Sequence, residues 1–226
     1  KDRLLSKKSF LTIDKLLENL FSRNKVKSLI QIGANDGQRF DTINYFIKTY
    51  SPSCLLVEPI KENFEKLKKN YNKFSKVTFD NSAITVGDEI NYLYKVGQKF
   101  LINYDDHIPG ITSFDKNHLI KHGVKKTHII KERVETITIN NLILKHKLLN
   151  FDLLFVDVEG YDANIVIDFF SNSSLRPIIV LEYIHIKNGI FKNLINILEL
   201  NKYIFFSINE NMICFPEEDK NLISFN

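Results

Sequence analysis

Three acids in this sequence come directly after runs of apolar residues: Glu58, Asp157 and Glu182. Such runs are typical of strands buried in a parallel sheet, and the carboxyl ends of these strands line the ligand crevice of an open α/β sheet. A single acid at a strand end is usually only solvated. Three acids on one rim instead predict a site that holds a cation, removes a proton or binds a hydroxyl group.

The segment from Asp157 to Gly160 is the most specific of these pieces. Alternation along an extended chain puts Asp157 and Glu159 on the same side, and Gly160 permits a sharp exit into the following helix. Two carboxylates at a cleft can balance a sulfonium, take a proton from a hydroxyl or bind a divalent metal. The structural alternative is that they cap the N-terminus of that helix.

Two pairs of residues bring histidine into the set of candidate side chains. Glu182 and His185 offer an acid and an imidazole that could bind an acceptor or act as a base. His118 and His122 have the helical spacing of metal ligands, but no third ligand can be identified in the sequence. We therefore expect a solvated helix face there and assign no metal site. The residues expected to take part in catalysis are Asp157, Glu159, Glu182 and His185.

Residues 28–37 predict a short buried strand that runs into a turn between Gly33 and Gly37. Dinucleotides place a pyrophosphate at the helix N-terminus after such a turn, and the carboxylate of Asp36 disfavours an anion there. A cofactor with a cationic sulfonium and no phosphate, such as S-adenosylmethionine, suits this turn better. Asp36 could also cap the helix, and the two roles are compatible.

Glu58 lies 21 residues after Gly37, which places it to accept hydrogen bonds from the ribose hydroxyls of a nucleoside cofactor. Polar residues at the end of the third predicted strand fall where an adenine ring would lie. The residues expected to bind the cofactor are Gly33, Ala34, Asn35, Asp36, Gly37, Glu58, Asn81, Ser82 and Asp157.

Strands and amphipathic helices alternate along the chain and must position these side chains. Apolar periodicity predicts helices over residues 12–22, 41–50, 60–70, 161–170 and 190–200. Strands are expected at 54–58, 77–84, 90–96, 136–139, 151–156 and 178–181, with a closing hairpin over 203–215. Residues 97–133 interrupt this rhythm with glycines, lysines and four of the six histidines. Such an insertion is usually a lid or binding loop, or is disordered.

The composition is that of one globular domain, with 226 residues, 44% of them hydrophobic and 26% charged. The net charge of +4 is too small to indicate a nucleic-acid partner. No apolar run approaches the roughly 20 residues that span a bilayer, no signal peptide is visible, and Cys54 and Cys214 lie in apolar runs. We expect a cytoplasmic protein without membrane insertion. Nucleophilic catalysis lacks support because no G-x-S-x-G motif occurs.

Taken together, these pieces resemble the FkbM-type methyltransferase family. The resemblance rests on residues 32–37, on Val57-Glu58-Pro59 with Asn63, Phe64 and Leu67, on residues 156–162, and on residues 177–182. Residues 110–114 look like the family's loop before its fourth core strand, and the pieces occur in order over about residues 28–216.

The resemblance implies an α/β, Rossmann-like class I methyltransferase fold. Its sheet would be mostly parallel and seven-stranded, with an antiparallel last strand and helices on both faces. We expect an N-terminal helix in residues 1–25, then one methyltransferase domain over 26–226 with a lid or acceptor insertion at about 97–133. The implied reaction is methyl transfer from S-adenosylmethionine to a hydroxyl of a sugar, polysaccharide precursor or natural product. The expected partner is a small-molecule or glycan acceptor, and the basic insertion favours an anionic one.

One departure from the family is Gln31, two residues before the first glycine, where such enzymes often carry an acid. An amide does not offset the positive charge of the cofactor, so Asp36, Glu58 or Asp157 must do so. The departure is also the best argument for the alternative function, a non-catalytic cofactor-binding or scaffold protein. Methylation of nucleic acid is disfavoured, because the aromatic–proline–aromatic motifs of base methyltransferases are absent.

Overall fold

A computed structural model gives the fold and describes residues 11–87, 91–105 and 107–223. The first part of the predicted N-terminal segment, the first residue of the strand predicted at 90–96 and the last three residues of the predicted domain lie outside these ranges. Within the described ranges, no helix is both long enough and apolar enough to cross a membrane.

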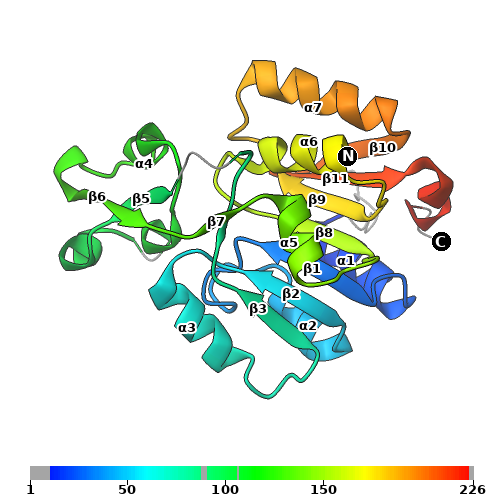
Figure 1. Cartoon of the computed structure of the whole chain (residues 1–226), viewed down its shortest axis with the longest axis horizontal. Coiled ribbons are helices and arrows are strands. Elements are labelled where there is room, and N and C mark those ends of the chain that lie inside the picture. The colour runs from blue at the N-terminus through cyan, green and yellow to red at the C-terminus, as the bar shows by residue number, and fades with distance from the viewer. Residues whose placement is uncertain (1–10, 88–90, 106, 224–226) are drawn as a thin grey trace, which may run out of the picture.

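The centre of the molecule is a sheet of seven strands in the order β10-β11-β9-β8-β1-β2-β3 (Figure 1). Pairing is parallel except for β11, which runs antiparallel to both β9 and β10. The predicted sheet and its antiparallel last strand are therefore confirmed. The strands are β1 Ser28–Ile32, β2 Ser53–Val57, β3 Val77–Asp80, β8 Leu153–Val156, β9 Ile178–Glu182, β10 Tyr203–Ile208 and β11 Asn211–Pro216.

The strand register explains why distant acids meet. Ile32 is paired with Val57 on one side and with Val156 on the other, and Val156 is in turn paired with Leu181. The four central strands therefore end level with one another. The residues that follow them come together at one edge of the sheet, as expected for a ligand crevice in an open α/β sheet.

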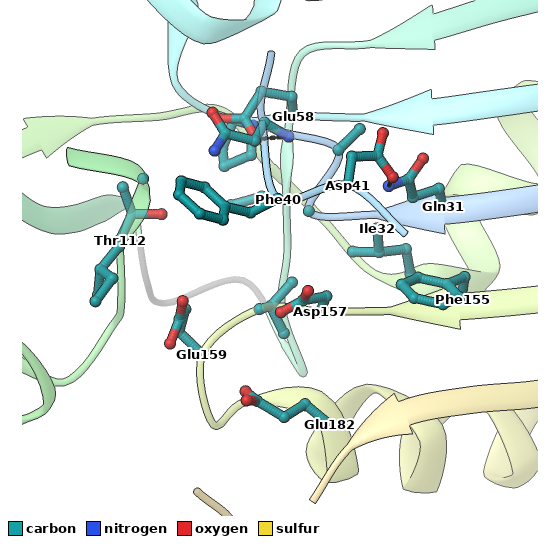
Figure 2. Close-up of a pocket in the computed structure, with 18 of the residues that line it drawn as sticks. Gln31, Ile32, Phe40, Asp41, Glu58, Thr112, Phe155, Asp157, Glu159 and Glu182 are labelled. Carbon is teal, nitrogen blue, oxygen red and sulfur yellow. Dashed lines mark hydrogen bonds between the residues drawn. The ribbon is translucent and has the colours of Figure 1, made fainter. Parts of the chain in front are cut away.

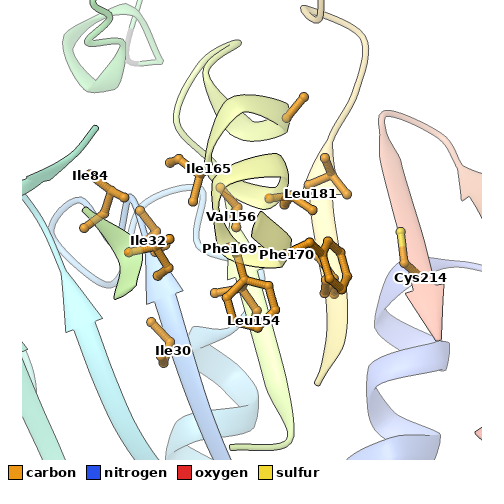
Figure 3. Packing of buried hydrophobic residues seen from close by; sticks show 14 of the residues in the cluster. Ile30, Ile32, Ile84, Leu154, Val156, Ile165, Phe169, Phe170, Leu181 and Cys214 are labelled. Carbon is orange, nitrogen blue, oxygen red and sulfur yellow. The ribbon is translucent and has the colours of Figure 1, made fainter. Parts of the chain in front are cut away.

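Helices cover both faces of the sheet. The apolar residues of β1 split by alternation: Leu29 packs in the cluster with α1, α2 and α3, and Ile30 in the cluster with α5, α6 and α7. Figure 3 shows Ile165 and Phe169 of α6 against this second face. The helices are α1 Ile13–Ser22, α2 Asn44–Tyr50, α3 Lys61–Asn70, α5 Ile139–Lys145, α6 Asp162–Asn172 and α7 Asn188–Leu200.

The predicted third strand is wrong beyond Asp80, because the chain bends there. The Asp80 carboxylate lies 2.6 Å from both the Ser82 hydroxyl and Nε2 of His146, which fixes the bend. After this bend, the two residues of β4, Ala83–Ile84, pair with β7 Thr136–Ile137 in a separate small sheet.

The insertion starts earlier than predicted. Strand β5 Tyr92–Val96 pairs antiparallel with β6 Ile129–Arg133, so the excursion covers residues 92–133, which we call the insertion. It has a small apolar core of its own, and it lies beside the carboxyl ends of the central strands (Figure 1). Between its strands are 3₁₀ turns η1 Gln98–Asn103, η2 Ile108–Gly110 and η3 Lys126–His128, and helix α4 Lys116–Lys121.

Candidate functional site

A cavity of about 480 Å³ lies at the carboxyl edge of the sheet, under the insertion. Of the predicted site residues, Gly33, Ala34, Asn35, Glu58, Ser82, Asp157, Glu159, Glu182 and His185 line it. Figure 2 shows Glu58 and Asp41 on one side of the cavity and Asp157, Glu159 and Glu182 on the other. The structure therefore brings together residues that lie more than 100 positions apart in the sequence.

The glycine turn is fitted tightly against the end of β8. Gly33 has a φ of +87°, and a Cβ atom there would lie 1.9 Å from the carbonyl oxygen of Asp157. The backbone N–H groups of Gly33 and Ala34 both donate to the carbonyl of Val57 at 3.0 Å. Only glycine meets both the left-handed backbone and the close approach. The turn thus fixes one wall of the cavity relative to the other.

Glu58 is the buried acid of this wall. One carboxylate oxygen accepts a hydrogen bond from the Asn35 N–H at 2.9 Å, and the other accepts from the Ile60 N–H at 2.8 Å. Burial raises the pKa of Glu58 to about 7, although these two hydrogen bonds act in the opposite direction. Glu58 is therefore held in one orientation against the glycine turn.

Three predicted cofactor residues position the turn and do not line the cavity. The Asp36 carboxylate accepts hydrogen bonds from the N–H groups of Gln38 and Arg39, both at 2.9 Å, so it fixes the turn and does not cap α2, which begins only at Asn44. Gly37 packs beside the ring of Tyr71. Asn81 donates from its side chain to the carbonyls that follow β2, at 2.8 and 3.0 Å.

A polar pair that the sequence did not single out lies at the base of the glycine turn. Nε2 of Gln31 donates to Oδ1 of Asp41 at 3.0 Å, and the same oxygen accepts from the Ile43 N–H. The other side-chain oxygens of Gln31 and Asp41 are buried without a hydrogen-bond partner among the described residues. Burial raises the pKa of Asp41. Its position before α2, typical of a capping acid, was the available signal.

The opposite wall carries three carboxylates. Burial raises the pKa of Asp157 to about 7 and that of Glu182 to about 9, and in each case the neighbouring carboxylates add to the effect. Oε2 of Glu182 has no hydrogen-bond partner among the described residues. This wall therefore suits a cation or a group that donates hydrogen bonds.

The loop after β8 does not continue the alternation on which the sequence argument relied. Glu159 has a φ of +58° and Gly160 a φ of +96°, so the chain turns sharply at both residues. Asp162, which is fully buried, accepts hydrogen bonds from the N–H groups of Val158 and Gly160 at 3.3 and 3.0 Å. Asp162 therefore fixes the turn that precedes α6, whose N-cap residue Tyr161 makes no side-chain capping hydrogen bond, and Glu159 is left to face the cavity.

The solvated helix face expected at His118 and His122 is wrong for His118, which is only 9% exposed. Helix α4 lies against the rim of the sheet, and Nε2 of His118 is 2.8 Å from Oε2 of Glu159. His122 lines the cavity together with His185. The sequence could not show this arrangement, because the insertion and the rim are separate segments of the chain.

The insertion also contributes to the roof of the cavity. A Cβ atom at Gly110 would lie 2.9 Å from Nδ2 of Asn35, so the insertion contacts the glycine turn directly. The ring of Phe114 packs on that of Tyr161 at 4.9 Å. The other lining residues that the sequence did not identify include Arg39, Phe40, His107, Thr112, Phe155 and Glu210.

The sheet order and the site at its carboxyl edge define a Rossmann-like class I methyltransferase. The family model described as Methyltransferase FkbM domain matches residues 31–205, and the chain belongs to this family. Its methyl donor is S-adenosylmethionine. A search of curated proteins returned no match.

Several solved methyltransferases are similar in structure. The ribosomal protein L11 methylase of Lactobacillus delbrueckii subsp. bulgaricus is 12% identical, with 88% of this chain and 75% of that chain covered and a TM-score of 0.43. The precorrin-6y C5,15-methyltransferase of Geobacter metallireducens GS-15 is 12% identical, with 91% of both chains covered and a TM-score of 0.44. The METTL16 MTase domain is 13% identical, with 89% and 63% covered and a TM-score of 0.47.

The residues present fit this cofactor. Gly33, Ala34 and Asn35 present the turn to the cavity, and Glu58 is a buried acceptor beside it. The partnerless oxygens of Gln31 and Asp41 are acceptors for the donor groups of a cationic ligand.

Proposed function

We propose that the protein is an O-methyltransferase that acts on a hydroxyl group of a sugar, polysaccharide precursor or natural product. One observation carries the proposal: a single cavity has the glycine turn with Glu58 on one side and three carboxylates on the other. The first side suits a nucleoside cofactor and the second suits a hydroxyl group that must lose its proton.

The cofactor side is assigned residue by residue. Glu58 would bind the ribose hydroxyls, and Gly33 to Asn35 would bind the methionine end, as the glycine turn predicts. Asp41, held by Gln31, is the acid that balances the positive charge in place of the acid missing at position 31. The cofactor, when bound, supplies an activated methyl group on a sulfonium.

The acceptor side aligns a hydroxyl oxygen for attack and removes its proton. Asp157 is the first candidate to take this proton, because it stands where the two walls meet, next to Gly33. The new bond would join the acceptor oxygen to the methyl carbon as the bond between that carbon and the sulfonium sulfur breaks, and the proton would pass to the Asp157 carboxylate. Glu182 and His185 would bind the acceptor, and the insertion would exclude water.

The acceptor we propose is anionic, such as a nucleotide- or lipid-linked sugar. Arg39 and His107 line the cavity, and His107 comes from the insertion, where basic residues gather. Basic groups favour the approach of a phosphate.

Two measurements test the function. Calorimetry with S-adenosylhomocysteine should give binding to the wild type, and absence of binding at millimolar ligand would favour the scaffold alternative. Label transfer from methyl-labelled S-adenosylmethionine to a panel of nucleotide- and lipid-linked sugars tests the reaction. Asp157→Asn should abolish transfer but leave cofactor binding measurable, whereas the exposed control Asp14→Asn should behave as wild type. Unchanged turnover in a folded Asp157→Asn variant would remove Asp157 from the mechanism.

A further inference from the structure

Four side chains with metal-binding chemistry meet where the insertion touches the rim of the sheet. They come from three segments: His118 and His122 from α4 and its C-cap, Glu159 from the loop after β8, and His185 from the loop after β9. One ligand atom from each residue lies within 4.8 Å of those of the other three. We propose that these four residues form a binding site for one divalent transition-metal ion, with Zn²⁺ the best match.

The side chains face one another as ligands around a common centre do. The His118 ring lies 4.6 Å from the His122 ring and 4.8 Å from the His185 ring, centroid to centroid, and the last two are 5.2 Å apart. Glu159 completes the cluster through its contact with Nε2 of His118. Nε2 of His185 also lies 3.7 Å from Oε1 of Glu182, so ion pairs account for three of the four residues. His122 makes no such pair with any residue that the structure describes, and its place beside the other two imidazoles is what a shared metal ion explains.

The backbone is bent to deliver the carboxylate. Glu159 adopts a left-handed conformation, which costs of the order of 1–3 kcal/mol for a residue other than glycine. Gly160 then allows a close approach, since a Cβ atom there would lie 3.4 Å from Cβ of His185. Asp162 holds this turn through its two hydrogen bonds to backbone N–H groups. The strained residue is therefore also the one that places an oxygen among three imidazoles.

The donor set selects the kind of ion. Imidazole nitrogen suits Zn²⁺ and its transition-metal neighbours, whereas Mg²⁺ and Ca²⁺ take oxygen ligands. In a tetrahedral site with metal–ligand bonds of about 2.0–2.1 Å, two ligand atoms are about 3.3–3.4 Å apart, so the widest separation in the cluster, 4.8 Å, closes by roughly 1.5 Å through side-chain rotation.

The position suggests two roles, and the second rests on the proposed function. A bound ion would join α4 of the insertion to the loops after β8 and β9, which fixes the roof of the cavity. Because His122, Glu159 and His185 line the cavity, an acceptor hydroxyl could bind the ion as a fifth ligand, and the ion would then lower the pKa of the hydroxyl and ease loss of its proton to Asp157.

The test uses the full chain and needs neither cofactor nor acceptor. Protein treated with EDTA and then freed of it is titrated with ZnCl₂ by calorimetry. We expect one ion per chain with a dissociation constant below 1 μM, and at least 100-fold weaker binding in His122→Gln/His185→Gln. The matched control is His128→Gln in the same insertion, whose ring stacks on Phe100 outside the cluster and whose loss should leave binding unchanged.

A second readout does not depend on the folding of a variant. Co²⁺ added to the wild type should give the intense visible absorption of a four-coordinate site, and X-ray absorption of the Zn²⁺ form should show scattering from several imidazole rings. Absence of stoichiometric Zn²⁺ binding, or equal affinity in the folded double variant, would overturn the site. S-adenosylhomocysteine binding is measured separately, so loss of the metal site and loss of methyltransferase function give different results.

Discussion

The side-chain amide of Gln31 donates a hydrogen bond to Oδ1 of Asp41 at 3.0 Å, so the two residues form one polar unit beneath the glycine turn. The unit explains how the chain manages without an acid at position 31. The amide orients a carboxylate that comes from ten residues further along, and an oxygen of each side chain is left without a partner at the cavity.

Asp41→Asn should therefore weaken S-adenosylmethionine binding by about tenfold, equivalent to roughly 1.4 kcal/mol. The double variant Gln31→Glu/Asp41→Asn moves the charge to position 31 and should recover most of the affinity. Calorimetry on both variants checks the expectation. Wild-type affinity in Asp41→Asn would show that this carboxylate does not balance the charge of the cofactor.

Gly33→Ala should disrupt the site and the fold around it. The new methyl group would lie 1.9 Å from the Asp157 carbonyl oxygen at a φ of +87°, and this backbone oxygen cannot move away without shifting β8. We expect a loss of several kcal/mol of stability and no measurable cofactor binding. Gly189→Ala is the control, because nothing lies within 4 Å of its Cβ position in α7. It should be neutral or stabilise by up to about 1 kcal/mol, and thermal melts compare the two.

Much of the fold was predictable because buried parallel strands and amphipathic helices leave strong periodic signals. The apolar run at 151–156 and the acid after it indicated both β8 and the position of Asp157 at the rim. That the strand-end acids meet at one rim followed from the rule that parallel strands share a carboxyl edge.

The parts that sequence could not predict depend on contacts between distant segments. No local pattern relates His118 to Glu159, which are 41 residues apart, or indicates that Glu159 leaves the extended conformation. In the sequence, Asp41 is only the first residue of a predicted helix, and no local pattern indicates that Gln31 lies beside it. The insertion was placed too late in the chain because the partner of β5 lies more than 30 residues further on.

Cofactor affinity should depend on pH through Glu58. Burial raises the pKa of this acid from its usual value of 4.5 to about 7, so at pH 6 the unliganded site is mostly protonated. Ribose hydroxyls bind better to the ionised form, so binding should release a proton and should strengthen by up to about fivefold from pH 6 to 7, by about twofold more at higher pH, and level off above about pH 8. Calorimetry in buffers of different ionisation enthalpy measures that proton. The rise in cofactor affinity between pH 6 and pH 7 should disappear in Glu58→Gln.

The same shift determines how the unliganded protein responds to pH. A carboxyl group whose pKa is higher in the folded than in the unfolded protein stabilises the fold in its protonated form. The stabilisation from Glu58 is therefore complete below about pH 4.5 and is lost as the pH rises through about 7. Saturating cofactor should reduce the loss. Denaturant titrations at pH 5 and pH 8, on wild type and on Glu58→Gln, would contradict this account if both proteins lost stability equally over that interval.

Variants of Asn81 test whether this residue positions the segment after β2 or contacts the cofactor directly. Its side-chain amide donates to the carbonyls of Glu58 and Pro59 at 2.8 and 3.0 Å, and it does not line the cavity. Asn81→Asp replaces this donor by a carboxylate that repels both carbonyls, so it should weaken cofactor binding more than Asn81→Ala, which only removes about 1 kcal/mol of hydrogen bonding. Both variants should also lose thermal stability without cofactor, which a residue that only contacts adenine would not cause. Affinity loss with an unchanged melting temperature in both variants would instead place Asn81 against the adenine ring.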